Sequence, residues 1–577
     1  MKAQFEFLGK ERSTRDNVKT KASKGRFWRG SLIVYYVGLI LGLAVLWLVF
    51  VPPINLRSQT FCGLLIPISF AVIWPLIPVN TWHQYKKKSD EQNLKVKGKL
   101  IALVVSLIKS IRLLAIPLLL CVLFFVLNLF SHPILQSRNY ANLIHKENGD
   151  FTADVAEIKF YDIPTVDRVT ATRLGNKKMG EIPELVSQFE VAPDYTQINY
   201  QGKPVRVTQL RYGDLFKWFN NRSEGLPRLI RVDMTNGEVT LQEIKGGMKY
   251  SDSEPLFRNI KRHLRLKYPF TIMGEPQIEI DDDGNPYWIV PTESPKVGWF
   301  GGLDVTGVIL CNAVDGSCEY YDVKDAPSWI DRVYPEEMVT EQLNYNGLYQ
   351  SGWLNSLFGQ KGVLTTTDGY NYLAINDDVY LYTGITSVAG DSSNLGFVLV
   401  NMRTKETKFY PVASADEQSA RNSAEGAVQE KGYKATWPIL LNIGSRPTYC
   451  MALKDEAELI KMYALVDAQD YQRTATATSI KEAIDNYQMQ ELANQPTEQT
   501  EPVKTLTKQV EVADITQVTI EGNTYYYMVF KQENKVFFAA LSVDQNLPFI
   551  KPGDKLRVEY EESQSDNTPL RIVQIEH

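Results

Sequence analysis

Residues 279–290 of the chain read EIDDDGNPYWIV: an apolar segment, an acidic turn and an apolar return. The Asp-Gly step supplies the backbone geometry of a hairpin turn, and the aromatic and aliphatic alternation after it is typical of a half-buried strand. A calcium-binding loop that began at Glu279 would need a bidentate acid near Val290, and the sequence has none there. The stretch therefore predicts a β-hairpin with its extra aspartates on a solvated turn.

Three further stretches follow the same pattern, in which a turn with glycine precedes Pro or Asn and then an alternating strand. They are INYQGKPVRV (198–207), LTTTDGYNYLAI (364–375) and LNIGSRPTYCMAL (441–453), with turns predicted at Gly202, Gly369 and Gly444. Because the glycine recurs and the aspartates do not, turn geometry rather than ligand binding explains the acidic run at 281–283.

A second strand pair follows each hairpin, and its first strand ends at Asp or Asn. These pairs span 229–244, 308–323, 397–412 and 462–477, with the polar residue at Asp233, Asn312, Asn401 and Asp467. Helices are predicted before the hairpins, over 166–178, 254–268, 336–344 and 415–431. A helix followed by antiparallel hairpins is an α+β arrangement. The sequence therefore predicts four α+β units at 132–250, 251–330, 331–412 and 413–486. The alternative is one mixed α+β domain that merely aligns with itself.

The unit of helix, hairpin and a strand ending in V-[DN]-x-x-x-G resembles the PepSY domain. The second unit carries the fullest match, in IEIDDDGNPYWIV and VILCNAVDGSCEYYDV, and the first unit matches in RVDMTNGEV. The third and fourth units have RTKE and AQDY in place of the glycine turn. The resemblance implies an extracytoplasmic module for binding or regulation, including peptidase inhibition, rather than catalysis. The whole layout is similar to large cell-envelope membrane proteins of Gram-positive bacteria.

Three apolar stretches before these units, at 30–51, 60–79 and 113–131, each have the length of a membrane-spanning helix. The chain has a net charge of −5, but residues 1–30 carry nine Lys/Arg against three acids, and residues 80–112 carry eight against two. The positive-inside rule therefore places the tail 1–29 and the basic loop 80–112 in the cytoplasm. Region 30–131 then holds three plasma-membrane helices, and residues 132–577 are extracytoplasmic. Residues 98–112 read as a lead-in to the third helix, with a fourth span as the alternative.

Two contrasting segments follow the four units. Residues 487–504 are rich in Gln, Glu, Thr and Pro, which predicts a solvated linker. Residues 505–577 contain about five strand-like stretches and resemble an OB-fold, a small β-barrel. Acids such as Glu511 and Glu559 outweigh the basic side chains, so core packing explains the tyrosines at 525–527 better than nucleic-acid binding does. The net charge of about −18 after residue 112 also disfavours nucleic acid as a partner.

Cys311 and Cys318 flank NAVDGS in the second predicted strand pair of the second unit. Opposite positions across a short loop lie within disulfide reach, and an extracytoplasmic location permits the bond. The alternative is two reduced, unrelated thiols. Past the membrane the only histidines are His132, His145, His263 and His577, and no HExxH, GxSxG or Walker A pattern occurs. The sequence therefore assigns no catalytic, cofactor-binding or metal-binding residue.

These observations predict a membrane-anchored binding, scaffold or regulatory protein of the cell envelope with no catalysis of its own. The expected partners are another envelope protein and the lipid bilayer, and the oligomeric state stays open. The alternative is a carboxylate-dependent hydrolase acting on cell-wall glycan, because such an enzyme needs only two well-placed acids. A cleft with two close acids of perturbed pKa would favour that alternative.

Overall fold

The computed structural model describes residues 30–576 except 93–95, 158–159, 376–377, 389–392, 495–504, 521–522, 534, 542, 545 and 562–568. The predicted tail 1–29 lies outside the described residues. The chain divides into two compact units, Met1–Ala483 and Ile484–His577. Among the described residues, the first unit contains the apolar helices, four large sheets and one two-stranded sheet, and the second contains a barrel.

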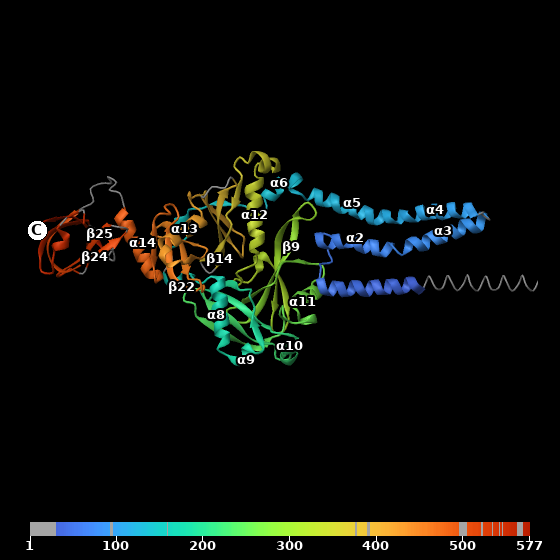
Figure 1. Cartoon of the computed structure of the whole chain (residues 1–577), viewed down its shortest axis with the longest axis horizontal. Helices are drawn as coiled ribbons and strands as arrows, with labels where there is room; N and C mark the ends of the chain where they lie inside the picture. The colour runs from blue at the N-terminus through green and yellow to red at the C-terminus, as the bar shows by residue number, and fades with distance from the viewer. Residues whose placement is uncertain are drawn as a thin grey trace, which may run out of the picture. The chain divides into compact units, whose positions relative to one another are not determined.

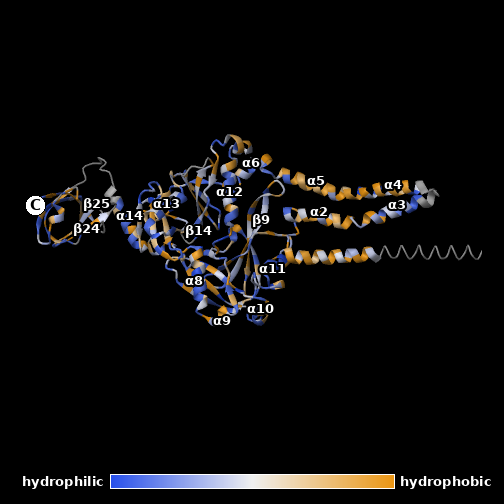
Figure 2. Cartoon of the chain, in the orientation of Figure 1, coloured by the Kyte–Doolittle hydropathy of each residue, from blue (hydrophilic) through white to orange (hydrophobic). Residues whose placement is uncertain are grey.

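Three helices in the first unit are long and apolar enough to cross a membrane (Figures 1 and 2): Gly30–Phe50, Gln59–Lys88 and Gly98–Phe130. The second begins with α2 (Gln59–Ile73) and continues into α3 (Leu76–Gln92), and the third comprises α4 (Val96–Ile111), the 3-10 turn η1 (Arg112–Leu114) and α5 (Ala115–Phe130). The prediction of three apolar helices is confirmed. The predicted loop at 80–112 is largely helical instead, because α3 extends the second helix, α4 begins the third, and the two pack along each other. No glycine or proline lies between Trp82 and Gly98 to end the helix early.

Four antiparallel sheets share one connectivity, in which two short strands pair one after the other along the same edge of a third strand. The first sheet has β2 (Phe189–Val191) and β3 (Thr196–Tyr200) on β4 (Lys203–Tyr212), then β5 (Leu226–Asp233) and β6 (Val239–Met248). The second has β7 (Ile272–Met273) and β8 (Gln277–Ile280) on β9 (Pro286–Val297), then β10 (Gly301–Asn312) and β11 (Cys318–Asp322).

The third and fourth sheets repeat this order. The third has β12 (Leu364–Thr366) and β13 (Asn371–Ile375) on β14 (Asp378–Ser387), then β16 (Gly396–Asn401) and β17 (Thr407–Tyr410), and β1 (Glu147–Asn148) adds a parallel edge to β17. The fourth has β19 (Lys434–Ala435) and β20 (Ile439–Ile443) on β21 (Arg446–Lys454), then β22 (Ile460–Asp467) and β23 (Thr474–Ala477). The strands β15 (Ser393–Asn394) and β18 (Ser414–Ala415) pair with each other.

A helix precedes each sheet: α8 (Arg168–Gly180), α11 (Ile260–Lys267), α12 (Glu336–Tyr349) and α13 (Glu417–Ala427). The remaining helices of the first unit are α6 (Pro133–Ala141), α7 (Phe151–Asp154), α9 (Pro183–Val186) and α10 (Leu215–Asn221), and α14 (Ile480–Asn494) follows the fourth sheet. The helix predicted at 254–268 is split, because Asn259 accepts a hydrogen bond from the backbone N–H of Arg262 and so begins α11 after the 3-10 turn η3 (Leu256–Arg258). The linker prediction is wrong for 487–494, which are helical, and 495–504 lie outside the described residues.

The hairpin predicted at 364–375 does not form. Both β12 and β13 pair with β14 and not with each other, so the chain does not reverse at Gly369. That glycine instead permits close approach, since a Cβ there would lie 2.5 Å from the Trp437 ring. The turns predicted at Gly202, Gly284 and Gly444 are confirmed, and all three glycines have positive φ.

The first unit predicted at 132–250 also begins in the wrong place. Asn346 of α12 donates to the carbonyl of Ala141, β1 extends the third sheet, and Asn442 of β20 donates to the carbonyl of Val155. Residues 133–157 therefore run along the third and fourth sheets before the chain reaches the first. The segment between the last membrane helix and α8 is long enough to reach these two sheets, and no local sequence pattern indicates that it does.

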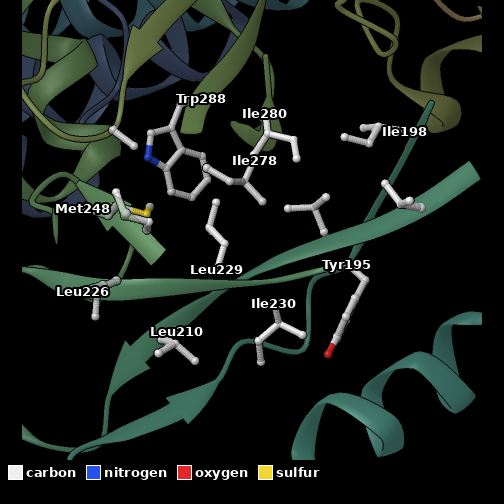
Figure 3. Packing of buried hydrophobic residues seen from close by; sticks show 14 of the residues in the cluster. Tyr195, Ile198, Leu210, Leu226, Leu229, Ile230, Met248, Ile278, Ile280 and Trp288 are labelled. Atoms are coloured by element: carbon white, nitrogen blue, oxygen red, sulfur yellow. The ribbon is translucent and has the colours of Figure 1, made fainter. Parts of the chain in front are cut away.

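The second sheet is buried on both faces. Trp288 and Val290 of β9 pack with Leu229 of the first sheet in one core, whereas the intervening Ile289 packs with Leu343 of α12 in another. Figure 3 shows the first of these cores, with Trp288, Ile278 and Ile280 facing Leu229 and Leu226. A strand covered on both faces reads as a nearly continuous apolar run, which explains the segment PYWIV.

In each of the four sheets, the first strand of the second strand pair ends at an Asp or Asn, and this residue has the same role in all four. Its side-chain Oδ1 accepts backbone N–H groups two and three residues onward, at Asp233, Asn312, Asn401 and Asp467. This is an Asx turn, which satisfies two backbone donors that the strand pair leaves free. In the third sheet Lys405 takes the position of the turn glycine with a φ of 67°.

The C-terminal unit holds a closed five-stranded barrel in the order β24-β25-β26-β28-β27. Its strands are β24 (Thr505–Ile520), β25 (Asn523–Phe530), β26 (Val536–Ala540), β27 (Lys555–Glu561) and β28 (Leu570–Glu576). Phe530, Phe537 and Tyr526 belong to its buried core. The expectation that aromatic residues here pack inside a small barrel is confirmed for these three side chains.

Candidate binding cleft between the first and second sheets

The segment between β11 and α12 lies where the first three sheets meet. The buried carboxylate of Glu279, on β8, accepts the backbone N–H groups of Asp331 at 3.1 Å and Arg332 at 3.2 Å. Asp331 accepts the backbone N–H of Asn199, on β3, at 2.6 Å. Arg332 donates to the hydroxyl of Tyr372, on β13, at 2.7 Å. One short segment therefore fixes three sheets to one another.

A cavity of about 550 Å³ opens beside this segment, between the first and second sheets. Its walls come from β3, β4, α11, β8 and the start of α12. The charged residues that line it are Arg168, Arg211, Lys261 and Arg332 against Asp194, Asp252, Glu275 and Glu336. Equal numbers of the two signs leave the cavity polar but close to neutral.

Most of these charges are already engaged with each other. Arg211 lies 2.9 Å from Asp194 and also pairs with Asp252. Lys261 pairs with Glu275 at 2.5 Å. Because each charge has an opposite neighbour, a strongly anionic or cationic ligand would have to break an existing pair to gain a new one. The walls therefore favour a ligand without net charge.

Three residues that line the cavity carry buried polar atoms that have no partner among the described residues. They include the amide oxygens of Gln209 and Gln277 and the Nε of Arg332. Gln209 is 4% exposed, and its amide nitrogen is fixed on Asp252 at 2.7 Å. A buried polar atom without a partner destabilises a protein by roughly 1–3 kcal/mol. A ligand with neutral donors and acceptors would satisfy these atoms.

The carboxylates do not form the acid pair that a glycosidase requires. Burial alone would raise the pKa of Glu336, but the adjacent Arg332 guanidinium and the hydrogen bonds to the carboxylate together outweigh it, and the pKa falls below its usual value. Burial raises the pKa of Glu279, yet its oxygens are held by backbone N–H groups away from the cavity lining. Burial and then Glu275 raise the pKa of Glu293 to about 7, and Glu293 is likewise not among the lining residues. The cavity therefore supports binding better than hydrolysis.

The structure joins Cys311 and Cys318 as a disulfide between directly opposed positions of β10 and β11. The ring nitrogens of His263 lie near both sulfurs, within a cluster spanning 4.8 Å. Its Nε2 is 2.7 Å from the carbonyl oxygen of Gly316, and burial lowers its pKa. Lys267 also donates to that carbonyl at 2.7 Å. With both sulfurs in a covalent bond and an ammonium alongside, this cluster staples the hairpin to α11.

The acidic turn quoted at the outset is a docking point between sheets. Asp281 closes the turn by accepting the backbone N–H of Asn285 at 2.7 Å. Gln242, on β6, donates to the carbonyl oxygen of Gly284 at 2.6 Å, and Gln201 donates to that of Asp282. The turn prediction is confirmed, and the side chain of Asp281 bonds to the backbone of the turn.

Sequence reasoning did not find the cleft residues. Gln209, Gln277 and Arg332 come from three different sheets or connections, and none stands in a recognisable motif. The single available signal was Gln209, which takes the next apolar position of the alternating stretch VRVT at 205–208. No protein-family model and no curated protein matches the chain.

Proposed function

We propose that the chain is a membrane-anchored, non-catalytic binding protein of the cell envelope. Its four sheets act as tandem PepSY-like units, and its barrel, with the strand order of an OB-fold, follows them outside the cytoplasm. The apolar helices anchor it in the plasma membrane. The cleft beside Arg332 receives an extended segment of an envelope protein partner.

The observation that carries this proposal is the match between the cleft and a peptide backbone. A peptide group offers one donor and one acceptor without net charge. The amide oxygens of Gln209 and Gln277 accept N–H groups, and the Nε of Arg332 donates to a carbonyl. The paired charges at the rim exclude highly charged segments and leave the neutral backbone as the preferred ligand.

The test is photocrosslinking in intact membranes with the full chain. A benzophenone amino acid replaces Lys261 at the rim of the cleft, and the same group at the exposed Lys177 of α8 is the matched control. The expected result is one polypeptide adduct from position 261, absent from position 177. It should be weakened at least about five-fold by Q209L together with Q277L, which remove both amide oxygens.

An adduct to glycan, or equal adducts from both positions, would contradict the proposal. Glycan capture would revive the hydrolase alternative, which is then checked by release of new reducing ends from cell-wall glycan. An unchanged thermal unfolding transition in the double variant shows that it still folds.

A further inference from the structure

The folded part carries an exposed apolar surface on α10 and η3, formed by Leu215, Phe216, Phe219, Leu256 and Phe257, which we name the α10–η3 surface. Phe216 is 84% exposed and Phe257 is 60% exposed. Isolated apolar side chains at a surface are normal, but a contiguous group of large ones marks an interaction site. These five side chains therefore indicate a surface that contacts another molecule.

Hydrogen bonds connect this surface to the end of the first apolar helix. The Nε of Arg262 donates to the carbonyl oxygen of Leu48, inside the helix Gly30–Phe50, at 2.9 Å. The same guanidinium donates to the carbonyl of Leu256 at 3.3 Å. Arg258 then donates to the carbonyl of Arg222, at the end of α10, at 2.7 Å. Figure 1 shows α11 beside the end of that helix, with α10 next to it.

The surface is held rigidly in its exposed position. The buried carboxylate of Glu254 accepts from the indole of Trp218, on α10, at 2.8 Å and from the hydroxyl of Tyr212 at 2.9 Å. Leu256 has a φ of 55°, a left-handed conformation that is costly for a leucine. A strained backbone that directs Leu256 and Phe257 outward implies that something receives them.

Basic side chains accompany the aromatic ones. The guanidinium of Arg222 lies 3.9 Å from the centroid of the Phe219 ring, and Lys217 and Arg258 are on the same two elements. Aromatic side chains with Lys and Arg beside them match the boundary between acyl chains and phosphate headgroups. Phe270 is a further exposed aromatic residue near the apolar helices, because its carbonyl accepts from Asn55 at 2.8 Å and its ring is 65% exposed.

We infer that the α10–η3 surface inserts its apolar side chains into the interface of the bilayer that the three apolar helices cross. The lipid leaflet at the end of helix Gly30–Phe50 is thus a second attachment, which fixes the tilt of the first and second sheets against the membrane. Lys217, Arg222 and Arg258 contact the phosphate groups of that leaflet.

The test uses the full chain in lipid nanodiscs that contain anionic phospholipid. An environment-sensitive fluorescent amino acid replaces Phe216 or Phe257, and the same amino acid replaces the exposed Tyr471 in the turn of the fourth sheet as control. Lipids with a nitroxide near the headgroup are then added as quencher. We expect the quenching at 216 and 257 to exceed that at 471 at least about three-fold. The emission of the probes at 216 and 257 should be blue-shifted, and this shift should change when the lipid is exchanged for detergent.

Equal quenching at 216, 257 and 471 would overturn the inference. Burial of the probes against a second copy of the chain would also overturn it. In that case the protein would form dimers, and the probes would keep a blue-shifted emission that the nitroxide lipids do not quench. R222E together with R258E should lower the quenching at 216 and leave that at 471 unchanged. If it does not, the phosphate contacts are refuted.

Discussion

Arg265 fixes Val51 at the point where the first apolar helix ends. Its Nε donates to the carbonyl oxygen of Val51 at 2.8 Å, and its Nη1 donates to the carbonyls of both Tyr268 and Thr271. Val51 has a φ of 42°, which is strained for a β-branched residue. The guanidinium is 6% exposed, and burial lowers its pKa to about 10. A buried cation therefore holds a strained helix exit against the second sheet.

R265M should loosen this junction without unfolding the chain. The change leaves three carbonyl oxygens without their charged donor, each hydrogen bond being worth about 1.5–3 kcal/mol. Amide hydrogen exchange at 268–273 in nanodiscs should accelerate by roughly ten-fold or more. K177M, at an exposed basic residue of α8, is the control. Unchanged exchange in R265M would mean that the guanidinium does not hold the junction.

N312A should destabilise the second sheet by roughly 1 kcal/mol, because it removes the Asx turn that satisfies two backbone N–H groups. N312D keeps an oxygen at the same position and should retain most of the stability. Thermal unfolding of both variants measures the difference. Equal losses in N312A and N312D would show that the amide group, and not the turn oxygen, matters.

E293Q should remove part of the pH dependence of stability. The pKa of Glu293 is raised to about 7, chiefly by burial and then by Glu275, so the folded state favours the neutral acid. Its stabilising contribution is present below the unfolded pKa of about 4.3 and is lost as the pH rises through about 7. E293Q should therefore exceed the parent by roughly 3–4 kcal/mol at pH 8 and match it near pH 4. Chemical unfolding at the two pH values provides the measurement, and a constant difference between them would refute the assignment.

The disulfide predicts how many free thiols the denatured protein contains. Denatured, unreduced protein should react with three equivalents of thiol reagent, from Cys62, Cys121 and Cys450. C311A together with C318A should lower the free energy of unfolding by about 2 kcal/mol, the entropic value for a short closed loop. Five reactive thiols in the untreated protein would show that the pair is reduced.

The sequence was most informative where structure is local. Glycine turns at Gly202 and Gly284, the Asx position at Asn312 and the long apolar helices all follow from neighbouring residues. It failed where pairing is non-local. The Asp-Gly step at Gly369 looked like a reversal, yet its neighbours on both sides pair with the same strand, and the glycine makes room for Trp437.

The candidate cleft was not predictable for the same reason. Gln209 and Gln277 are ordinary polar residues in sequence, and they become notable only because Arg332, on a distant connection, brings two sheets together around them. The helix through 487–494 was missed because its Gln and Glu content suggested a solvated linker, although these residues are also good helix formers.

The recurrent Asx turns separate two groups of positions in the four sheets. Asp233, Asn312, Asn401 and Asp467 each use Oδ1 on backbone groups within their own turn. An oxygen occupied in this way is not available to a ligand, so these shared positions determine how the chain reverses. Any difference in binding between the four sheets must then come from the positions at which their sequences differ.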